Sequence, residues 1–212
     1  MEGLFITFEG PDGAGKSTQI RLLSEWLTDR GHDVVVTREP GGCKVSEEIR
    51  EVILDIRHRN MTPVTEALLY AAARAQHVDE VILPALREGK TVICDRFMDS
   101  SLAYQGAGRR LGMERVADMN RHAIQGLTPA ITFLCRINPS LSRLRIWGRS
   151  VPDRMESEKE EFQARVLKGF DELAKLYPER ICEIDAGRDI QEVYSEIIGH
   201  VGTLLEQREK KT

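Results

Sequence analysis

Residues 10 to 17 carry the spacing G-x-x-x-x-G-K-[ST], which is the pattern of a phosphate-binding loop. Its glycines let the backbone wrap around a phosphate chain, so that several main-chain N–H groups point at one anion. Lys16 can reach the β- and γ-phosphates, and the Ser17 hydroxyl can ligate Mg²⁺. The sequence therefore predicts a site for ATP or another nucleoside triphosphate, formed by Gly10, Pro11, Asp12, Gly13, Ala14, Gly15, Lys16, Ser17 and Thr18.

Three other charged segments follow apolar stretches that resemble strands. Asp95 ends one such stretch, the usual placement of a second Mg²⁺ anchor beside a phosphate loop. Arg96 follows it, and Arg38 ends another stretch, so both are placed for a second anion. The run from 143 to 154 is rich in arginine and contains Gly148 and Pro152. It is either a solvated helix face or a lid that neutralises charge on a transferring phosphoryl group.

This set of residues favours phosphoryl transfer to an acceptor that is itself a phosphate. Such a transfer needs in-line positioning and cations at the equatorial oxygens, and the acceptor supplies its own nucleophilic oxygen. The chain offers one loop lysine, a pair of Mg²⁺ ligands and many arginines. Its five histidines show no metal-ligand spacing, so we expect them to be surface or structural residues.

The elements that must position these residues alternate along the chain. Apolar, β-branched segments with little alternation predict strands that are buried on both faces. Between them, helical spacing places apolar residues on one face, most clearly from 190 to 205. This alternation predicts an α/β fold in which helices flank a five-stranded parallel sheet, with the strands' carboxyl ends at one edge. The strands are expected at residues 4–8, 33–37, 91–94, 130–135 and 181–184.

Bulk properties narrow the class of protein. The 212 residues are 41% hydrophobic and 30% charged, which suits one domain with a substantial core. The net charge of −4 argues against a nucleic-acid partner. The longest apolar run, 67 to 73, is too short to span a bilayer, and the N-terminus lacks the pattern of a signal peptide. With four scattered cysteines, these features point to the cytoplasm.

Beyond the phosphate loop, several motifs occur in one order over nearly the whole chain, and together they resemble thymidylate kinase. The phosphate loop alone marks only a superfamily, whereas Asp12 inside it and the Ser-Leu-Ala-Tyr-Gln-Gly segment are much more specific. This resemblance implies a fold of the nucleoside monophosphate kinase type, with ATP as donor, dTMP as acceptor and a homodimeric assembly. The motifs span residues 8–18, 37–42, 69–77, 95–106, 126–129 and 153–156.

The resemblance also implies roles for single residues. Asp12 would meet the deoxyribose 3′-hydroxyl. Tyr70 would stack on thymine and Arg74 would hydrogen-bond the base, which suits an aromatic face and an Arg fork. The acceptor site would be completed by Ser101 near the base edge, by Tyr104 against the sugar, and by Gln105.

For the reacting phosphates, the resemblance implies that Arg38 and Arg96 hold the acceptor phosphate. Some family members carry a catalytic arginine inside the phosphate loop, where this chain has Gly13. The chain is therefore similar to the bacterial form, in which a lid residue supplies the charge. We expect one domain over residues 1–212 with a lid at about 145–157, in which Arg149 and Arg154 are the candidates.

Other functions remain open at this point. Another nucleotide kinase could share these motifs, and a deoxynucleoside kinase would need a base such as Glu9 or Glu39. A GTPase is disfavoured because no Asn-Lys-x-Asp motif occurs. A non-enzymatic ATP-gated switch would lack an acceptor pocket, and the set Tyr70, Arg74 and Tyr104 counts against it.

Overall fold

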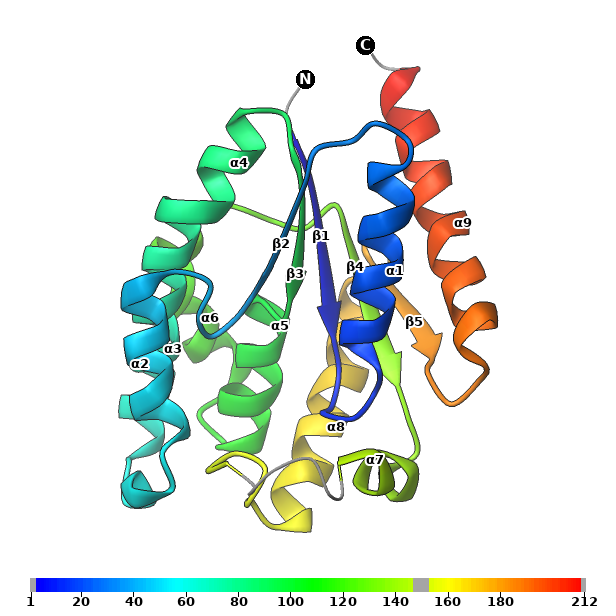
Figure 1. The fold of residues 1–212 in the computed structure, drawn as a ribbon. Coiled ribbons are helices and arrows are strands. Elements are labelled where there is room, and N and C mark those ends of the chain that lie inside the picture. Colours follow the sequence, from blue (N-terminus) through cyan, green and yellow to red (C-terminus); the bar gives the residue numbers. More distant parts are fainter. Residues whose placement is uncertain (1–2, 147–152, 211–212) are drawn as a thin grey trace.

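A five-stranded parallel sheet forms the centre of the molecule, in the strand order β2-β3-β1-β4-β5 (Figure 1). We describe it from a computed structural model that covers residues 3–146 and 153–210. All neighbouring strands run parallel, which confirms the predicted fold class and places every strand within about one residue of its expected range. The strands are β1 Leu4–Glu9, β2 Val34–Arg38, β3 Thr91–Asp95, β4 Ile131–Arg136 and β5 Ile181–Asp185.

Strand β1 lies at the middle of the sheet, and all six of its residues are buried. Successive side chains alternate between the faces. Ile6 and Phe8 enter the core beneath α1 and α9, whereas Phe5 enters the core beneath α4. Burial on both faces explains why β1 is a continuous apolar run rather than an alternating one.

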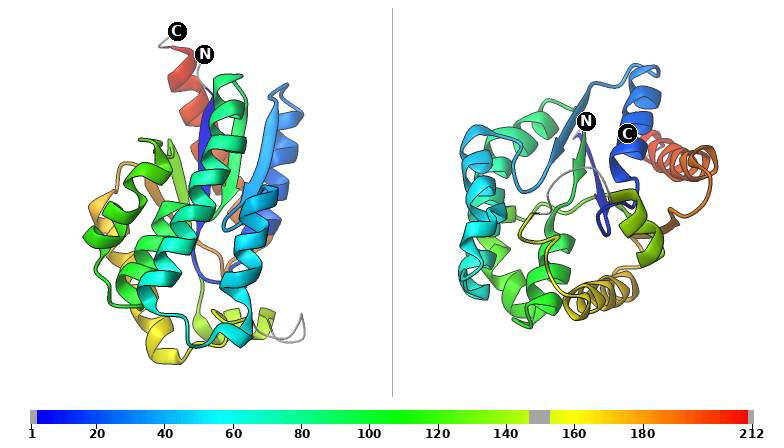
Figure 2. Two further views of the ribbon diagram at one scale, coloured as in Figure 1. Left: turned by 90° about the vertical axis from the view of Figure 1, so that its left-hand side faces the viewer. Right: turned by 60° about the horizontal axis from the view of Figure 1, so that its bottom comes forward.

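Helices cover both faces of the sheet, as the turned views show (Figure 2). Helices α1 and α9 pack together on one face. On the other, α8 packs against the π-helical segment η3, and α3 packs against α2 and α6. The helices are α1 Lys16–Thr28, α2 Lys44–Leu54, α3 Pro63–His77, α4 Leu83–Arg87, α5 Met98–Ser101, α6 Met113–Ile124, α7 Pro139–Ile146, α8 Glu160–Leu176 and α9 Ile190–Glu209, with η1 Ile56–His58, η2 Val78–Ile82 and η3 Leu102–Gly108.

Local signals in the sequence account for several helix boundaries. The Thr62 side chain accepts a hydrogen bond from the Thr65 N–H, and Pro63 occupies the first turn of α3. Pro84 lies inside a long helical segment, where a proline ordinarily ends or kinks the helix. The chain instead passes through the π-helical turn η2, where the Leu83 N–H donates to the Val78 carbonyl five residues back, and continues as α4.

The carboxyl ends of the strands meet at one edge, the lower one in Figure 1, where the phosphate loop joins β1 to α1. Gly10 in this loop has φ +121°, and a Cβ atom there would lie 2.4 Å from the Cys135 carbonyl oxygen. Only glycine fits such a conformation and so close an approach. Among the described residues, no helix is long and apolar enough to cross a membrane.

Candidate active site

Two backbone carbonyls of the phosphate loop accept hydrogen bonds from the ammonium group of Lys16. Lys16 Nζ donates to the carbonyls of Gly10 (3.3 Å) and Pro11 (3.0 Å) and lies 3.9 Å from Asp95 Oδ1. Burial lowers its pKa, and the nearby Arg96 charge lowers it further. Gly15 begins α1 without a side-chain cap, so the first N–H groups of the helix remain available for an anion.

Asp95 and Ser17 provide oxygen atoms that fit a magnesium ion. Asp95 Oδ1 is buried, lies 3.9 Å from Lys16 Nζ and accepts no hydrogen bond from any residue that the structure describes. Ser17 is exposed in the first turn of α1. Mg²⁺ typically takes one or two protein carboxylates and completes its shell with phosphates and water. Within the described residues, no group of three or more His, Cys, Asp or Glu side chains could hold a metal ion.

Arg96 joins the phosphate loop to the segment after β3. Its guanidinium donates to Asp12 Oδ1 (2.7 Å) and to Ser100 Oγ (3.1 Å), and it lies 5.3 Å from the centre of the Tyr104 ring. Partial desolvation raises the pKa of Asp12, but the charges of Arg96 and Lys16 outweigh it, and the pKa falls to about 2. Asp12 is therefore ionised at neutral pH.

The backbone of Arg96 explains how its side chain reaches this position. Arg96 has φ +71°, a left-handed conformation that is uncommon for a residue with a Cβ atom. Its N–H donates to the Phe8 carbonyl, which ties it to the end of β1. Backbone strain of this kind is concentrated at functional sites. Here it turns the chain sharply between β3 and α5.

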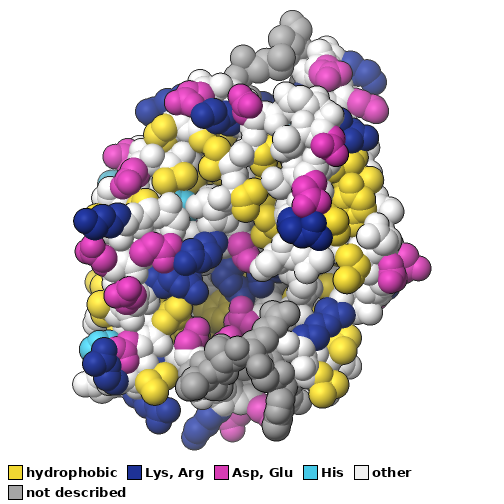
Figure 3. Space-filling view, viewed as in Figure 1, with side chains coloured by type: hydrophobic (Ala, Val, Ile, Leu, Met, Phe, Trp, Pro, Cys, Tyr) yellow, Lys and Arg dark blue, Asp and Glu magenta, His cyan; other side chains and the backbone are white. Residues whose placement is uncertain are grey.

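A cleft opens beside Arg96 and Asp12. Apolar and aromatic side chains line it together with a few polar groups, which is typical of a small-molecule site. In the space-filling view, basic and acidic side chains surround a hollow whose floor is hydrophobic (Figure 3). Its lining comes from many parts of the chain: Asp12, Glu39, Pro40, Arg50, Leu54, Tyr70, Arg74, Arg96, Phe97, Ser100, Ser101, Tyr104, Gln105, Asp153 and Met155.

Arg74 lines the inner part of the cleft and is held rigidly. It is 2% exposed and donates to Glu39 Oε2 (2.7 Å), to the Phe97 carbonyl (3.0 Å) and to Asn120 Oδ1. Three of its five N–H groups are thereby used, which leaves two for a ligand. The other carboxylate oxygen of Glu39 faces His77 Nδ1 at 3.1 Å.

Tyr70, Ser101 and Tyr104 also line this cleft, as the resemblance implies. Burial raises the pKa of Tyr104 to about 12 and raises that of Tyr70 as well, so both phenols stay neutral. Ser101 Oγ is buried and has no hydrogen-bond partner within the described part of the chain. A buried polar atom of this kind is costly unless a ligand or water satisfies it.

Arg50 lines the cleft, whereas Arg38 does not. The resemblance implies that Arg38 holds an anion, but its guanidinium faces Glu47, with hydrogen bonds of 2.8 and 2.9 Å, outside the cleft lining. Arg50, which the sequence analysis missed, lines the cleft and donates to the Pro40 carbonyl (2.9 Å). Only the packing of α2 against α3 brings Arg50 to the site, and no local motif marks it.

Of the two lid arginines that the sequence suggests, the structure describes only Arg154. Arg149 lies outside the described residues. Arg154 is buried, donates to Glu66 Oε2 (2.6 Å) and to the Ile53 carbonyl (2.6 Å), and does not line the cleft. Among the described contacts, none joins Arg154 to the phosphate loop. Gln105 lines the cleft and donates to Glu66 Oε1 (2.9 Å).

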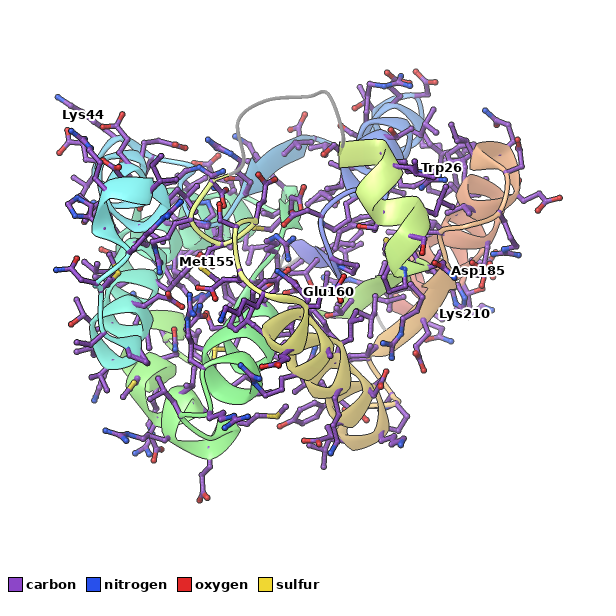
Figure 4. The ribbon with its side chains drawn as sticks, turned by 90° about the horizontal axis from the view of Figure 1, so that it is seen from below. Trp26, Lys44, Met155, Glu160, Asp185 and Lys210 are labelled. Atoms are coloured by element: carbon purple, nitrogen blue, oxygen red, sulfur yellow. The ribbon has the colours of Figure 1, made fainter. Side chains whose placement is uncertain are left out.

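Helix α7 contributes another residue that the sequence analysis did not single out. Arg145 Nη1 approaches the carbonyls of Gly13 (3.5 Å) and Ala186 (3.2 Å), and Ser142 Oγ donates to the Asp12 carbonyl (2.6 Å). Seen from below, α7 lies on the Asp185 side of the edge, whereas Met155 lies on the side of α2 and α3 (Figure 4). Helix α7 therefore lies over the phosphate loop, whereas the segment that contains Met155 lines the cleft.

Two buried carboxylates were considered as catalytic bases, and both are fully engaged. Glu9 accepts from the N–H groups of Phe97 (2.8 Å) and Ser100 (3.2 Å) and from Ser100 Oγ (2.5 Å). Burial, with the Asp99 charge, raises the pKa of Glu9 to about 7. Glu39 is paired with Arg74 and His77. Glu9 does not line the cleft, and Glu39, which does, has one oxygen bound to Arg74 and the other facing His77.

Comparisons with known proteins agree with this geometry. Residues 8–197 match the family model described as thymidylate kinase. The chain is 49% identical to a thymidylate kinase of an Exiguobacterium species over 98% of both chains, and 47% identical to one of Lactobacillus acidophilus over 100% of this chain and 98% of the other. The crystal structure of thymidylate kinase from Ehrlichia chaffeensis superposes with a TM-score of 0.78 at 34% identity, covering 95% of this chain and 99% of that one.

Proposed function

This chain belongs to the thymidylate kinase family and transfers the γ-phosphoryl group of ATP to dTMP, and from that premise we propose which residues perform each part of the reaction. One observation carries the proposal: Asp12 belongs to the phosphate loop and also lines the acceptor cleft. Donor and acceptor sites therefore share a residue, as in-line transfer between two bound nucleotides requires.

On the donor side, Gly10 to Thr18 bind the phosphates of ATP through backbone N–H groups and the N-terminus of α1. Lys16 moves its ammonium group from the loop carbonyls onto the β- and γ-phosphates. Ser17 and Asp95 would hold Mg²⁺, in keeping with the Asp95 Oδ1 atom, which accepts no hydrogen bond from the described residues. The ion would supply positive charge that offsets the charge developing on the phosphates in the transition state.

On the acceptor side, Arg96 and Arg50 hold the phosphate of dTMP, while Arg38 stays with Glu47. Arg96 directly follows the Mg²⁺ ligand Asp95 in the sequence. It can therefore both bind the acceptor phosphate and act as a catalytic residue near the transferring phosphoryl group. Asp12 accepts a hydrogen bond from the 3′-hydroxyl of the sugar. Because the acceptor oxygen is already ionised, no protein base is needed, which agrees with the full engagement of Glu9 and Glu39.

The nucleoside occupies the inner cleft. Tyr70 stacks on thymine, and the remaining N–H groups of Arg74 with Ser101 Oγ bond its polar edge. Tyr104 packs against the sugar where a 2′-hydroxyl would otherwise project. Gln105 completes the lining while bound to Glu66.

The positive charge missing from the phosphate loop comes from a lid at about 145–157, part of which lies outside the described residues. Arg149 is the better candidate for this role, because the guanidinium of Arg154 is already neutralised by buried Glu66. Removing a charge that acts only in the transition state lowers kcat while KM stays similar. Arg149→Met is therefore expected to lower kcat about 100-fold.

We also propose a homodimer that works in the cytoplasm. Helices α2 and α3 pack together and expose the apolar side chains of Val45, Val52 and Leu68, each about half exposed. Exposed apolar side chains of this kind are typical of an interface. All four cysteines are free thiols, which suits a reducing compartment. Leu68→Glu should convert the dimer into a monomer in analytical ultracentrifugation, and a wild-type monomer would contradict the proposal.

An acceptor panel tests the function directly. The protein, ATP and Mg²⁺ are incubated with dTMP, dUMP, dCMP, AMP and thymidine, and the diphosphate and monophosphate products are quantified. We expect dTDP to form fastest and thymidine to remain unphosphorylated. Equal turnover of dTMP and AMP, or conversion of thymidine to dTMP, would contradict the acceptor assignment. Without added Mg²⁺, dTDP formation should stop, which tests the metal separately.

A further inference from the structure

A buried carboxylate that does not line the cleft holds several residues around it. Glu66, on α3, is fully buried. Its oxygens accept from Gln105 Nε2 (2.9 Å), from Arg109 Nε and Nη2 (2.9 to 3.1 Å), and from Arg154 Nη1 (2.6 Å). We call these residues the Glu66 cluster. It joins α3, η3 and the segment that precedes α8.

The cluster is electrically balanced. Arg109 is also paired with Glu158 (2.6 Å), and its guanidinium lies 4.5 Å from the Phe162 ring centre, so two arginines face two carboxylates. Burial raises the pKa of Glu66, but hydrogen bonds and charge from Arg109 and the other donors outweigh it, and the pKa is lowered overall. Removing one charge from such a group leaves the others buried and uncompensated, which is strongly unfavourable.

The cluster also determines where part of the cleft lining lies. Arg154 is fixed at three points: Glu66, the Ile53 carbonyl and, through its own N–H, the Leu54 carbonyl (3.1 Å). Its sequence neighbours Asp153 and Met155 line the cleft. Figure 4 shows Met155 between α8 and helices α2 and α3. If Arg154 lost Glu66, the segment that carries Asp153 and Met155 would lose one of its three anchoring contacts and the only charged one of the three.

We propose that Glu66 is a positioning residue for the acceptor nucleotide: it fixes Arg154, and thereby Asp153 and Met155, and it orients Gln105. Arg154 then acts on acceptor binding, through its neighbours Asp153 and Met155, and not on the transferring phosphoryl group. This inference rests on the acceptor site proposed above.

Isothermal titration of dTMP and of ATP, each alone, tests the inference on the full chain. Glu66→Gln keeps the shape of the side chain but removes its charge. We expect the Kd for dTMP to rise at least 10-fold and the Kd for ATP to change less than 2-fold. A general loosening of the fold would weaken both ligands, so equal weakening of both, or an unchanged Kd for dTMP, overturns the proposal.

Two further variants keep the test decisive. Glu158→Gln breaks the other carboxylate pair of Arg109 and leaves Arg154 with Glu66, so its Kd for dTMP should stay within 2-fold of wild type. Arg154→Met should raise the Kd for dTMP as Glu66→Gln does, and the double variant should be no worse than either single one. If Glu66→Gln does not fold, Arg154→Met decides alone.

The kinetic pattern separates positioning from catalysis. Arg154→Met should raise KM for dTMP with kcat changed less than 5-fold. A 100-fold loss of kcat with unchanged dTMP binding would instead make Arg154 the lid charge and overturn the inference. If wild-type protein does not bind dTMP at all, the proposed acceptor site itself fails, which is a different result.

Discussion

The phosphate loop and the acceptor cleft lie side by side but are built in different ways. The loop consists of nine consecutive residues, and its main binding groups are backbone N–H groups held by glycine geometry. The cleft is lined by side chains from six regions, from Asp12 to Met155. A contiguous backbone site can be recognised from local sequence, whereas a site of converging side chains depends on helix packing.

This difference predicts different responses to substitution. In the loop, the backbone provides most of the proposed phosphate contacts, and the Lys16 side chain provides the positive charge. In the cleft, each side chain is held by others, as Arg74 is by Glu39 and Asn120. A substitution in the cleft should therefore also displace the side chains that are hydrogen-bonded to the altered residue, and its main effect should be weaker acceptor binding.

The largest effect is expected at Lys16. Lys16→Met removes the cation that meets the β- and γ-phosphates and should lower kcat about 1,000-fold. Because its ammonium contacts only loop carbonyls and Asp95 in this structure, the fold should persist. Steady-state kinetics and circular dichroism measure both quantities. If the variant kept a tenth of wild-type activity, the claim that Lys16 is the main charged side chain of the loop would be wrong.

Glu9, between the two regions, should affect stability in a pH-dependent way. Its pKa of about 7 in the folded protein lies above the ordinary value of 4.5, so the stabilising contribution is complete below pH 4.5 and is lost as pH rises through 7. The loss is about 3 kcal/mol at most.

Urea denaturation between pH 5 and 8 measures this contribution. Glu9→Gln should remove most of the fall in unfolding free energy over that range. Asp12, whose pKa is lowered to about 2, keeps its full stabilising contribution above about pH 4 and therefore adds nothing to the change between pH 5 and 8. An identical slope in the variant and in wild type would show that Glu9 titrates normally.

Substitutions of Arg50, which lines the cleft, and of Arg38, which does not, provide a matched comparison. Arg50→Ala removes a charge-assisted contact to the acceptor phosphate and should raise KM for dTMP about 30-fold, the equivalent of about 2 kcal/mol. Arg38→Ala should change it less than 3-fold, because Arg38 faces Glu47 outside the cleft. If Arg38→Ala raised KM for dTMP more than Arg50→Ala does, Arg38 would be the residue that holds the acceptor phosphate, as the sequence suggests.

The smallest effect is expected from the Arg38–Glu47 pair on stability. Both side chains are about half exposed, and exposed ion pairs contribute about 0–1 kcal/mol. Arg38→Ala should therefore lower the free energy of unfolding by less than 1 kcal/mol in urea denaturation at moderate salt. A larger loss would mean that Glu47, which also accepts from the Gly42 N–H, depends on Arg38 to hold the loop.

Much of the fold was predictable because its signals are local. Buried parallel strands read as apolar runs, and caps such as Thr62 with Pro63 mark helix starts. The sequence was less informative at Pro84, where a π-helical turn accommodates the proline that was expected to end or kink the helix. Propensity alone does not specify this turn, because neighbouring packing selects it.

By itself, the sequence determined the phosphate loop, the parallel sheet and the residues at the strand ends, since each depends on neighbours within a few positions. Only the tertiary structure decided which arginine faces the acceptor cleft and where Arg154 is held. Arg50 reaches the cleft because α2 packs on α3, and Arg154 meets Glu66 across 88 residues of chain. Such choices depend on side-chain packing and charge balance between distant segments, which no local pattern records.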